Sequence, residues 1–181
     1  MQYRHELTLK NGVFCVLRSA VPNDAQAVLR HLTSVYGETD FLSRYPDEVN
    51  FTEDEERAFL AGLENSENAL FLVADIGGRI AATAGFQPYA ASSKLRHRAV
   101  LDVAVQKAYW GLGLGSALLG VLLDEAKRAG FELLELEVIA ENARAVALYE
   151  KFGFRTYGTL EKAFRLRDGR HQTELLMSRE I

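Results

Sequence analysis

The sequence predicts a mixed α/β fold: a central, mixed and mostly antiparallel sheet flanked by helices, with a βαβα unit late in the chain. Short apolar segments separated by turn dipeptides fill the first half of the chain. Strand-like and helix-like apolar patterns then alternate in the second half, as they do in βαβ units. No linker rich in Pro, Ser or Gly interrupts the chain, so we expect residues 1–181 to form a single domain.

Composition excludes several classes of protein. The chain is 48% hydrophobic and 25% charged, which is typical of a globular domain, and its net charge of −4 argues against binding to nucleic-acid phosphates. The longest mainly apolar stretch, around Leu118–Leu123, is far shorter than the roughly 20 residues that cross a bilayer. Met1–Glu6 lacks the apolar core of a signal peptide, so a cytoplasmic location is expected. Cys15 is the only cysteine, which excludes an internal disulfide and a cysteine-built zinc site; no metal is expected.

Two hairpins are predicted in the first half. The apolar segment Leu7–Leu17 contains Asn11–Gly12, a dipeptide that favours a tight turn. Ala69–Ile76 and Ile80–Gln87 read as two strands joined at Gly77–Gly78.

Two helices are predicted between these hairpins. Asn23 and Asp24 offer N-caps for the first helix, which has apolar residues at helical spacing. Thr52 followed by Glu55 is a capping-box pattern and predicts a second helix to about Leu63.

The second half alternates strands and helices. Apolar residues at helical spacing run from Leu114 to Ala126, and Gly130 ends that helix. The other predicted elements are strands at Arg98–Val105, Leu133–Val138, Arg155–Leu160 and Thr173–Arg179, and a short helix at Asn142–Phe152.

A glycine loop connects the Arg98–Val105 strand to the helix that follows. Gly111, Gly113 and Gly115 alternate in this loop, immediately before Ser116. Without side chains, backbone N–H groups can approach an anion closely, and the helix dipole adds positive potential there. The loop therefore predicts a site for a pyrophosphate group.

The glycine spacing alone does not identify the molecule that contains this pyrophosphate. A dinucleotide site competes, because Glu135 or Glu137 lies about 20 residues beyond Gly115, where an acid would bind ribose. Against it, Ser116 stands where the third glycine of Gly-x-Gly-x-x-Gly would fall. A phosphate-loop nucleotidase fits less well, because the chain lacks the Gly-Lys-Ser/Thr sequence.

A second motif follows the next strand and identifies a family. The segment from Asn142 to Phe154 matches Asn-x-x-Ala-x-x-Leu-Tyr-x-x-x-Gly-Phe at every specified position. Together with the glycine loop it resembles the GNAT superfamily of N-acetyltransferases, whose loop typically reads Arg/Gln-x-x-Gly-x-Gly/Ala. Trp110 departs from that pattern, since it stands where Arg or Gln is typical. The chain is also similar to bacterial ribosomal-protein alanine N-acetyltransferases and related small-amine acetyltransferases.

The resemblance implies acetyl transfer from acetyl-CoA directly to a primary amine, without a covalent enzyme intermediate. It implies that Asn142 and the strand residues Val103, Ala104 and Val105 hold the pantetheine arm. The residues implied to wrap the pyrophosphate are Gly111, Leu112, Gly113, Leu114, Gly115 and Ser116.

Tyr149 is the predicted general acid. Asn142, Ala145 and Tyr149 share one helix face at positions i, i+3 and i+7. A tyrosine is protonated at neutral pH, so its hydroxyl can donate a proton to the departing thiolate. The matched motif favours this role over core packing alone.

Glu137 is the predicted general base, because the resemblance to the ribosomal-protein alanine N-acetyltransferases places a glutamate there. Glu135, Asp102 and His97 are alternatives within reach of the same strands. For Glu135 and Asp102, an ordinary strand charge, exposed or paired in a salt bridge, is the favoured interpretation.

The acceptor is expected to be a small-molecule amine, with a protein N-terminus as the alternative and a homodimer left open. Acidic residues crowd Glu38–Glu56 against a single Arg44, and this acidity would attract a cationic amine. Arg167–Arg170 is expected at a polar hairpin tip near the acceptor. A CoA-binding domain without catalysis and a dinucleotide-dependent oxidoreductase remain alternative functions.

Overall fold

The computed structural model describes residues 1–181 and contains one eight-stranded sheet in the order β1-β2-β3-β4-β5-β6-β8-β7. All neighbouring strands are antiparallel except β5 and β6. The strands are β1 (Arg4–Thr8), β2 (Phe14–Ser19), β3 (Leu70–Ile76), β4 (Arg79–Pro88), β5 (Arg98–Val105), β6 (Leu133–Ile139), β7 (Arg155–Arg165) and β8 (His171–Glu180). This confirms the predicted mixed, mostly antiparallel sheet.

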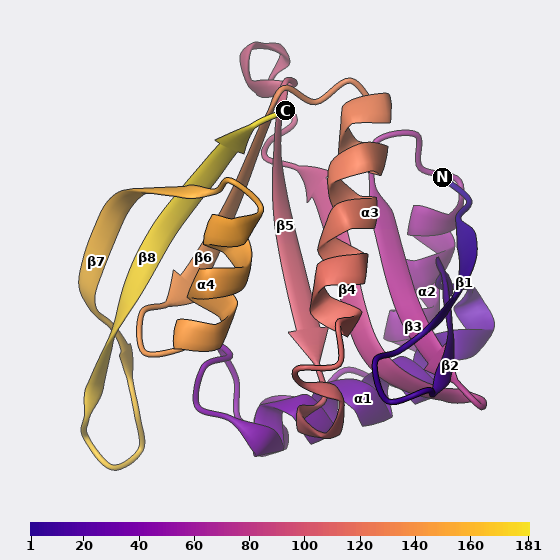
Figure 1. Cartoon of the computed structure of the whole chain (residues 1–181), viewed down its shortest axis with the longest axis horizontal. Coiled ribbons are helices and arrows are strands. Elements are labelled where there is room, and N and C mark those ends of the chain that lie inside the picture. The colour runs from indigo at the N-terminus through magenta and orange to yellow at the C-terminus, as the bar shows by residue number, and fades with distance from the viewer.

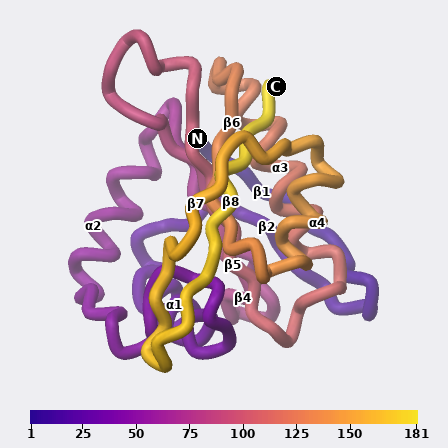
Figure 2. Tube along the Cα trace, turned by 90° about the vertical axis from the view of Figure 1, so that its left-hand side faces the viewer, coloured from indigo at the N-terminus to yellow at the C-terminus, as the bar shows by residue number.

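Helices cover both faces of the sheet. Figure 2 shows α1 and α2 on one side of the strands and α3 and α4 on the other. The helices are α1 (Ala25–Glu38), α2 (Glu53–Glu64), α3 (Leu114–Arg128) and α4 (Ala143–Lys151). None of them is long and apolar enough to cross a bilayer.

The core lies on both sides of the central strands. Leu114, Leu118 and Leu122 are fully buried along α3, in the larger cluster of apolar residues. On the opposite face Val28 of α1 packs in a smaller cluster with Val73 of β3. Burial on both faces explains why the central strands read as continuous apolar runs in the sequence.

The sheet opens between β5 and β6. These strands pair in parallel only where Arg98–Val100 lies beside Leu133–Glu135. Beyond Val100 they diverge, as Figure 1 shows, and β5 then has a neighbouring strand only on its β4 side. The split leaves an edge of β5 without a partner strand in the middle of the sheet, and the candidate site lies there.

Two local predictions need correction. Asp24 precedes α1, but its carboxylate binds Arg18 at 2.7 and 2.9 Å and accepts from the Val21 N–H, so it does not cap the helix. The last two strands are longer than predicted, because β7 is mainly exposed and carries no alternating apolar pattern that would reveal how far the hairpin extends. The capping box at Thr52 and Glu55 forms as predicted.

Candidate active site

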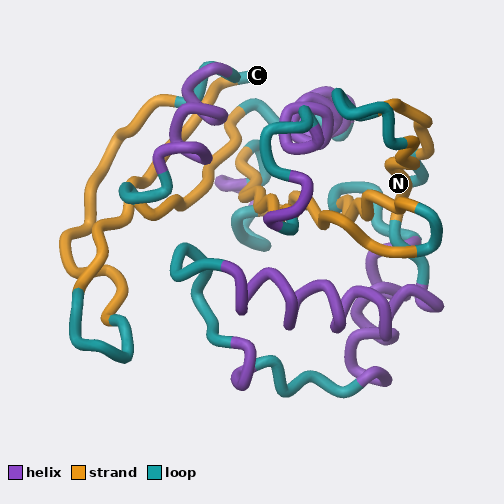
Figure 3. Tube along the Cα trace, turned by 60° about the horizontal axis from the view of Figure 1, so that its bottom comes forward, coloured by secondary structure: helices purple, strands orange, loops and turns teal.

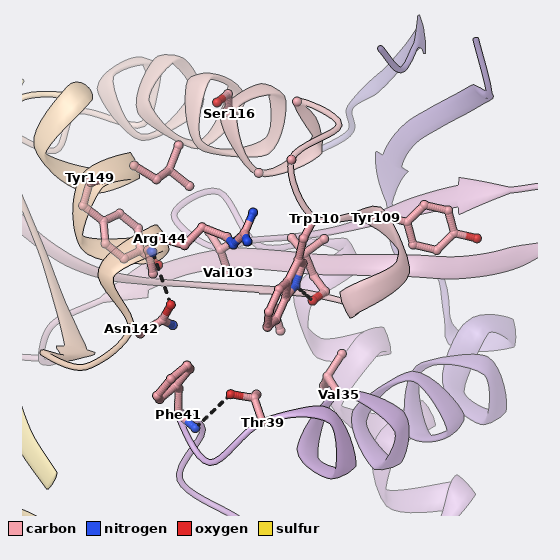
Figure 4. Close-up of a pocket in the computed structure, with 18 of the residues that line it drawn as sticks. Val35, Thr39, Phe41, Val103, Tyr109, Trp110, Ser116, Asn142, Arg144 and Tyr149 are labelled. Atoms are coloured by element: carbon pink, nitrogen blue, oxygen red, sulfur yellow. Dashed lines mark hydrogen bonds between the residues drawn. The ribbon is translucent and has the colours of Figure 1, made fainter. Parts of the chain in front are cut away.

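A cavity of about 360 Å³ occupies the split in the sheet. It lies between the start of α3, helix α4 and the end of α1, and Figure 4 shows Tyr149 and Asn142 on one side with Phe41 and Val35 opposite. The predicted site residues that line it are Val103, Ala104, Val105, Gly111, Gly113, Gly115, Ser116, Asn142 and Tyr149.

The glycine loop presents open backbone donors to this cavity. Gly111 (φ 76°) and Gly113 (φ 94°) adopt left-handed conformations that a side chain would strain. Gly113 caps α3 without a side chain, so the N–H groups of the first turn are left open to a ligand. A Cβ on Gly115 would lie 3.2 Å from Leu148 Cδ2, so this glycine is needed for close packing of α3 against α4.

Leu112 and Leu114, also predicted to bind the cofactor, do not line the cavity with their side chains. The Leu114 side chain is fully buried in the core. The Leu112 carbonyl accepts a hydrogen bond from the Lys10 N–H at 3.2 Å. Any role of these two residues toward a phosphate therefore belongs to their backbone.

Three cationic residues that the sequence analysis missed line the same cavity: Lys10, Arg144 and Lys151. The Arg144 guanidinium lies 5.1 Å from the centre of the Trp110 ring, near the glycine loop. Arg144 follows Asn142 closely at the start of α4, so its place within the Asn142–Phe154 motif could have indicated that it lies beside the cavity. Lys10 comes from the distant β1–β2 hairpin, and no sequence pattern connects it to the loop.

Trp110 fastens the glycine loop to the end of β5. Its indole Nε1–H donates to the Val105 carbonyl at 2.7 Å. Trp110 thus occupies the position where the family has Arg or Gln and serves as a structural anchor. On the open edge of β5, Val103 and Ala104 remain beside the cavity.

Tyr149 lies at the inner end of the cavity. It is 6% exposed, and its ring packs edge-on against Phe154 with 5.9 Å between centres. Its hydroxyl makes no hydrogen bond within the protein. Burial, together with the nearby Asp102 carboxylate, raises the Tyr149 pKa, so the hydroxyl keeps its proton at neutral pH.

Asn142 has a structural role in addition to its place at the cavity. Its Oδ1 accepts from the Ala145 N–H at 3.3 Å and so caps α4. The Asn142 side-chain amide donors stay available. The three residues predicted to share a helix face, Asn142, Ala145 and Tyr149, all line the cavity.

A second cavity, of about 520 Å³, lies on the α1–α2 side of the sheet. We call it the acceptor chamber. It shares Val35, Leu42, Val103 and Ala104 with the first cavity, so the two spaces meet at β5.

Asp102 of β5 lines the acceptor chamber and makes no ion pair or side-chain hydrogen bond. Asp102 is exposed to the space of the chamber, and the protein around it limits the hydration of its carboxylate, which raises the Asp102 pKa to about 6. Its effect on the Tyr149 pKa shows that the two groups are near each other. Nothing in the sequence distinguishes Asp102 from any other charged residue on a strand.

The other candidate bases are placed differently. Glu137 is exposed on β6 and lines neither cavity. Glu135 is buried and held by the Arg98 guanidinium at 2.7 and 2.8 Å, which is the salt bridge considered for it. His97 precedes β5, at the opposite end of the strand from the cavities.

His31 of α1 is buried behind β5. It is 1% exposed, and neither ring nitrogen makes a well-formed hydrogen bond, although the backbone of Ile80 and Ala104 lies beside it. Burial lowers the His31 pKa to about 4. The ring is therefore neutral at physiological pH.

The α1–α2 connection is tied to the tip of the β7–β8 hairpin, beside which it runs in Figure 3. The Arg167 guanidinium binds the Asp47 carboxylate at 2.7 and 2.8 Å and lies 3.9 Å from the centre of the Tyr45 ring. Arg170 adds a contact of 3.9 Å with Asp40. These contacts hold the connection that borders the two cavities.

This arrangement agrees with comparisons to known proteins. A family model described as Acetyltransferase (GNAT) family matches residues 32–154. The chain belongs to this acetyltransferase family. The resemblance stated from the two motifs is thereby confirmed.

Three similar proteins illustrate the match. The [ribosomal protein bS18]-alanine N-acetyltransferase of Escherichia coli K12 is 39% identical over 77 residues, which are 42% of this chain and 52% of that protein. The match thus spans about half the length of that relative. A GNAT-family acetyltransferase structure from Streptococcus pneumoniae is 33% identical with a TM-score of 0.88, covering 92% of this chain and 99% of that one. A Salmonella typhimurium acetyltransferase structure with its cofactor acetyl-CoA shares the fold, at 22% identity and a TM-score of 0.80 over 92% and 93% of the two chains.

Proposed function

We propose that this protein is an N-acetyltransferase that moves the acetyl group of acetyl-CoA directly to a primary amine. The observation that carries the proposal is the meeting of two cavities at Val103 and Ala104. A protonated hydroxyl, that of Tyr149, lies on one side of that junction and an unpaired carboxylate, that of Asp102, on the other. A donor and an acceptor that entered from opposite faces of the sheet would meet there.

The residues of the first cavity fit acetyl-CoA. The open N–H groups at the start of α3 and the cations Lys10 and Arg144 suit its phosphates. The unpaired edge of β5 at Val103–Val105 suits the amide-bearing pantetheine arm, which would hydrogen-bond along it as a strand does. When bound, acetyl-CoA supplies an acetyl thioester and a thiol leaving group.

In the transfer step, the amine nitrogen forms a bond to the thioester carbonyl carbon and the carbon–sulfur bond breaks. Asp102 accepts the proton that the nitrogen loses. Tyr149 donates its hydroxyl proton to the departing sulfur, and solvent exchange then returns both side chains to their starting states. The products are the acetamide and the free CoA thiol, so atoms and charge balance.

Asp102 is the base that we favour in place of Glu137. With a pKa of about 6, Asp102 is mostly ionised at pH 7 yet basic enough to take up a proton. Glu137 lies on the same side of the sheet as Asp102 but lines neither cavity. Glu137 would have to act through a chain of water molecules.

A small-molecule amine fits this site better than a protein N-terminus. Helices α1 and α2 wall the acceptor chamber, and the contacts of Arg167 with Tyr45 and Asp47 hold the adjoining connection in place. The E. coli relative that is named for ribosomal protein bS18 makes the protein N-terminus the second candidate acceptor.

Two measurements test the proposal. Calorimetric titration should show binding of acetyl-CoA and none of NADH, which would separate acetyl transfer from a dinucleotide-dependent reaction. Thiol release with a panel of primary amines and with an alanine-terminated peptide should then detect turnover, and mass spectrometry should find the acetylated product. Binding of acetyl-CoA without thiol release from any acceptor would make the protein a CoA-binding module and overturn the proposal.

A further inference from the structure

The acceptor chamber contains a buried carboxylate with no partner in the protein. Glu56 of α2 is only 8% exposed, lines the chamber and makes no ion pair or side-chain hydrogen bond. Burial raises the Glu56 pKa, which is the mark of a charge that the protein does not compensate. A buried carboxylate in a chamber open to ligands is satisfied best by a cation.

Most other acids between Glu38 and Glu56 are already engaged. Their partners are the Lys107 N–H for Glu38, Arg170 for Asp40, Arg167 for Asp47, the Tyr45 N–H for Glu48, Arg57 for Glu53, and Thr52 for Glu55. Asp54 is unpaired but fully accessible at the surface. The acidity seen in the sequence therefore reduces to one buried, unpaired carboxylate, Glu56.

Aromatic rings surround the same chamber. Tyr36, Phe51, Phe59 and Phe71 line it, and the Phe59 and Phe71 rings meet edge-on with 6.0 Å between centres. Aromatic faces attract ammonium groups, and they also pack against methylene chains. No Lys, Arg or His lines the chamber; the nearby Arg44 lies over the Phe51 ring at the surface. The chamber therefore offers no positive charge to pair with a carboxylate on the substrate.

Asp102 and Glu56 come from different walls, the sheet and α2, and neither carboxylate perturbs the pKa of the other. They therefore form two separate unpaired anionic points joined by a largely apolar space. Glu55 also lines the chamber, but Thr52 already engages its carboxylate. Asp102 lies near Tyr149 at the junction with the first cavity, whereas Glu56 lies away from it on α2.

We propose that the acceptor is a compact diamine, whose first amine is acetylated beside Asp102 while Glu56 and the aromatic rings bind its second, positively charged group. This inference rests on the proposed function. A short methylene spacer would cross the apolar space between the two carboxylates. An α-amino acid fits less well, because its carboxylate would enter a chamber whose charged residues are all acids.

Matched amines test the proposal. Thiol release is measured at saturating acetyl-CoA with the α,ω-diamines from 1,3-diaminopropane to 1,6-diaminohexane, and with monoamines of equal chain length. We expect the best diamine to exceed its matched monoamine in kcat/KM by about ten- to hundredfold, because it adds one charged hydrogen bond. The preferred chain length then reports the separation of the two carboxylates.

Two variants assign the effect to Glu56. Glu56→Gln should raise KM for the diamine until it resembles the monoamine, with kcat and the monoamine kinetics little changed. Asp54→Asn is the matched control, because it removes an exposed, unpaired carboxylate of the same helix that does not line the chamber. Calorimetric titration of the diamine into the protein bound to CoA should show the same loss of affinity in Glu56→Gln, independently of turnover.

The outcomes separate this inference from the proposed function. Equal use of diamines and monoamines, equal losses for both in Glu56→Gln, or a preference for amino acids or an alanine-terminated peptide would overturn the diamine assignment and leave acetyl transfer intact. Bound acetyl-CoA with no thiol release from any amine would overturn the proposed function itself.

Discussion

Replacing Asp102 with asparagine should remove one ionisation from the pH dependence of the reaction. With a pKa of about 6, the Asp102 carboxylate is about nine-tenths ionised at pH 7 and about one-tenth ionised at pH 5. The acceptor amine contributes its own ionisation, because only its neutral form attacks and its pKa lies near 10. Together they predict a wild-type log(kcat/KM) that rises with a slope of two below pH 6 and a slope of one above it.

In Asp102→Asn only the amine ionisation remains, so the slope should be one throughout. General base catalysis typically contributes about 10²–10⁴-fold, so kcat at pH 7 should fall by that order. Asp102 makes no ion pair or hydrogen bond, and its raised pKa marks a charge that destabilises the folded state at neutral pH. Asparagine should therefore leave the thermal midpoint unchanged or raise it, which separates a loss of catalysis from a loss of folding. The assay is thiol release between pH 5 and pH 9 with one amine, with acetyl-CoA affinity measured in parallel.

Glu137→Gln is the matched comparison, since it removes the competing carboxylate by the same isosteric change. It should keep the wild-type profile, because Glu137 lines neither cavity. The assignment is refuted if Glu137→Gln loses the change of slope near pH 6 while Asp102→Asn retains both the slope and the rate.

Three further predictions follow from the same geometry. Tyr149→Phe should lower kcat by about a hundredfold, the low end for general acid catalysis. Stability and acetyl-CoA affinity should stay unchanged, because the hydroxyl has no partner and the ring keeps its contact with Phe154. Normal turnover under conditions where chemistry limits the rate would exclude the general-acid role. Gly113→Asp should abolish acetyl-CoA binding in calorimetry, whereas Gly113→Ala, which shares the backbone strain but adds no charge, should retain measurable affinity. Lowering the pH from 7 to 5 should reduce the free energy of unfolding by about 2 kcal/mol more in wild type than in His31→Gln. The reason is that His31 takes up a proton near the ordinary histidine pKa of 6.5 in the unfolded chain but only near 4 in the folded chain. Denaturant titrations at the two pH values measure this, and equal losses in both proteins would show that His31 is not the titrating group.

Much of the fold was predictable because its signals are local. The turn dipeptides Asn11–Gly12 and Gly77–Gly78, the Thr52 capping box and the apolar stripe of α3 are local signals. Each occurs as predicted. The length of the β7–β8 hairpin was underestimated because β7 is an edge strand that pairs only with β8 and is mainly exposed, which leaves no alternating apolar pattern along it. Asp24, like Asn23, was a candidate cap from its position alone. Its actual partner, Arg18, lies on another element, which the local sequence does not reveal.

The cofactor side of the site was more predictable than the acceptor side for a related reason. Gly111 to Ser116 and Asn142 to Tyr149 are contiguous motifs, whereas Lys10, Glu56 and Asp102 reach the two cavities from separate elements. Whether a carboxylate such as Asp102 is an ordinary strand charge or an enclosed, unpaired group depends on what packs around it. That information is carried by the tertiary structure.

Direct acetyl transfer at the junction of the two cavities is tested most directly by product analysis of the wild-type protein. Incubation with acetyl-CoA and a diamine should yield one acetylated amine for each free thiol, as measured by mass spectrometry and thiol titration, with no acetyl group left on the protein. Equal amounts of amide and thiol on an unmodified protein are the predicted result. Thiol release without acetylated amine, or an acetylated protein that forms before the product, would contradict direct transfer.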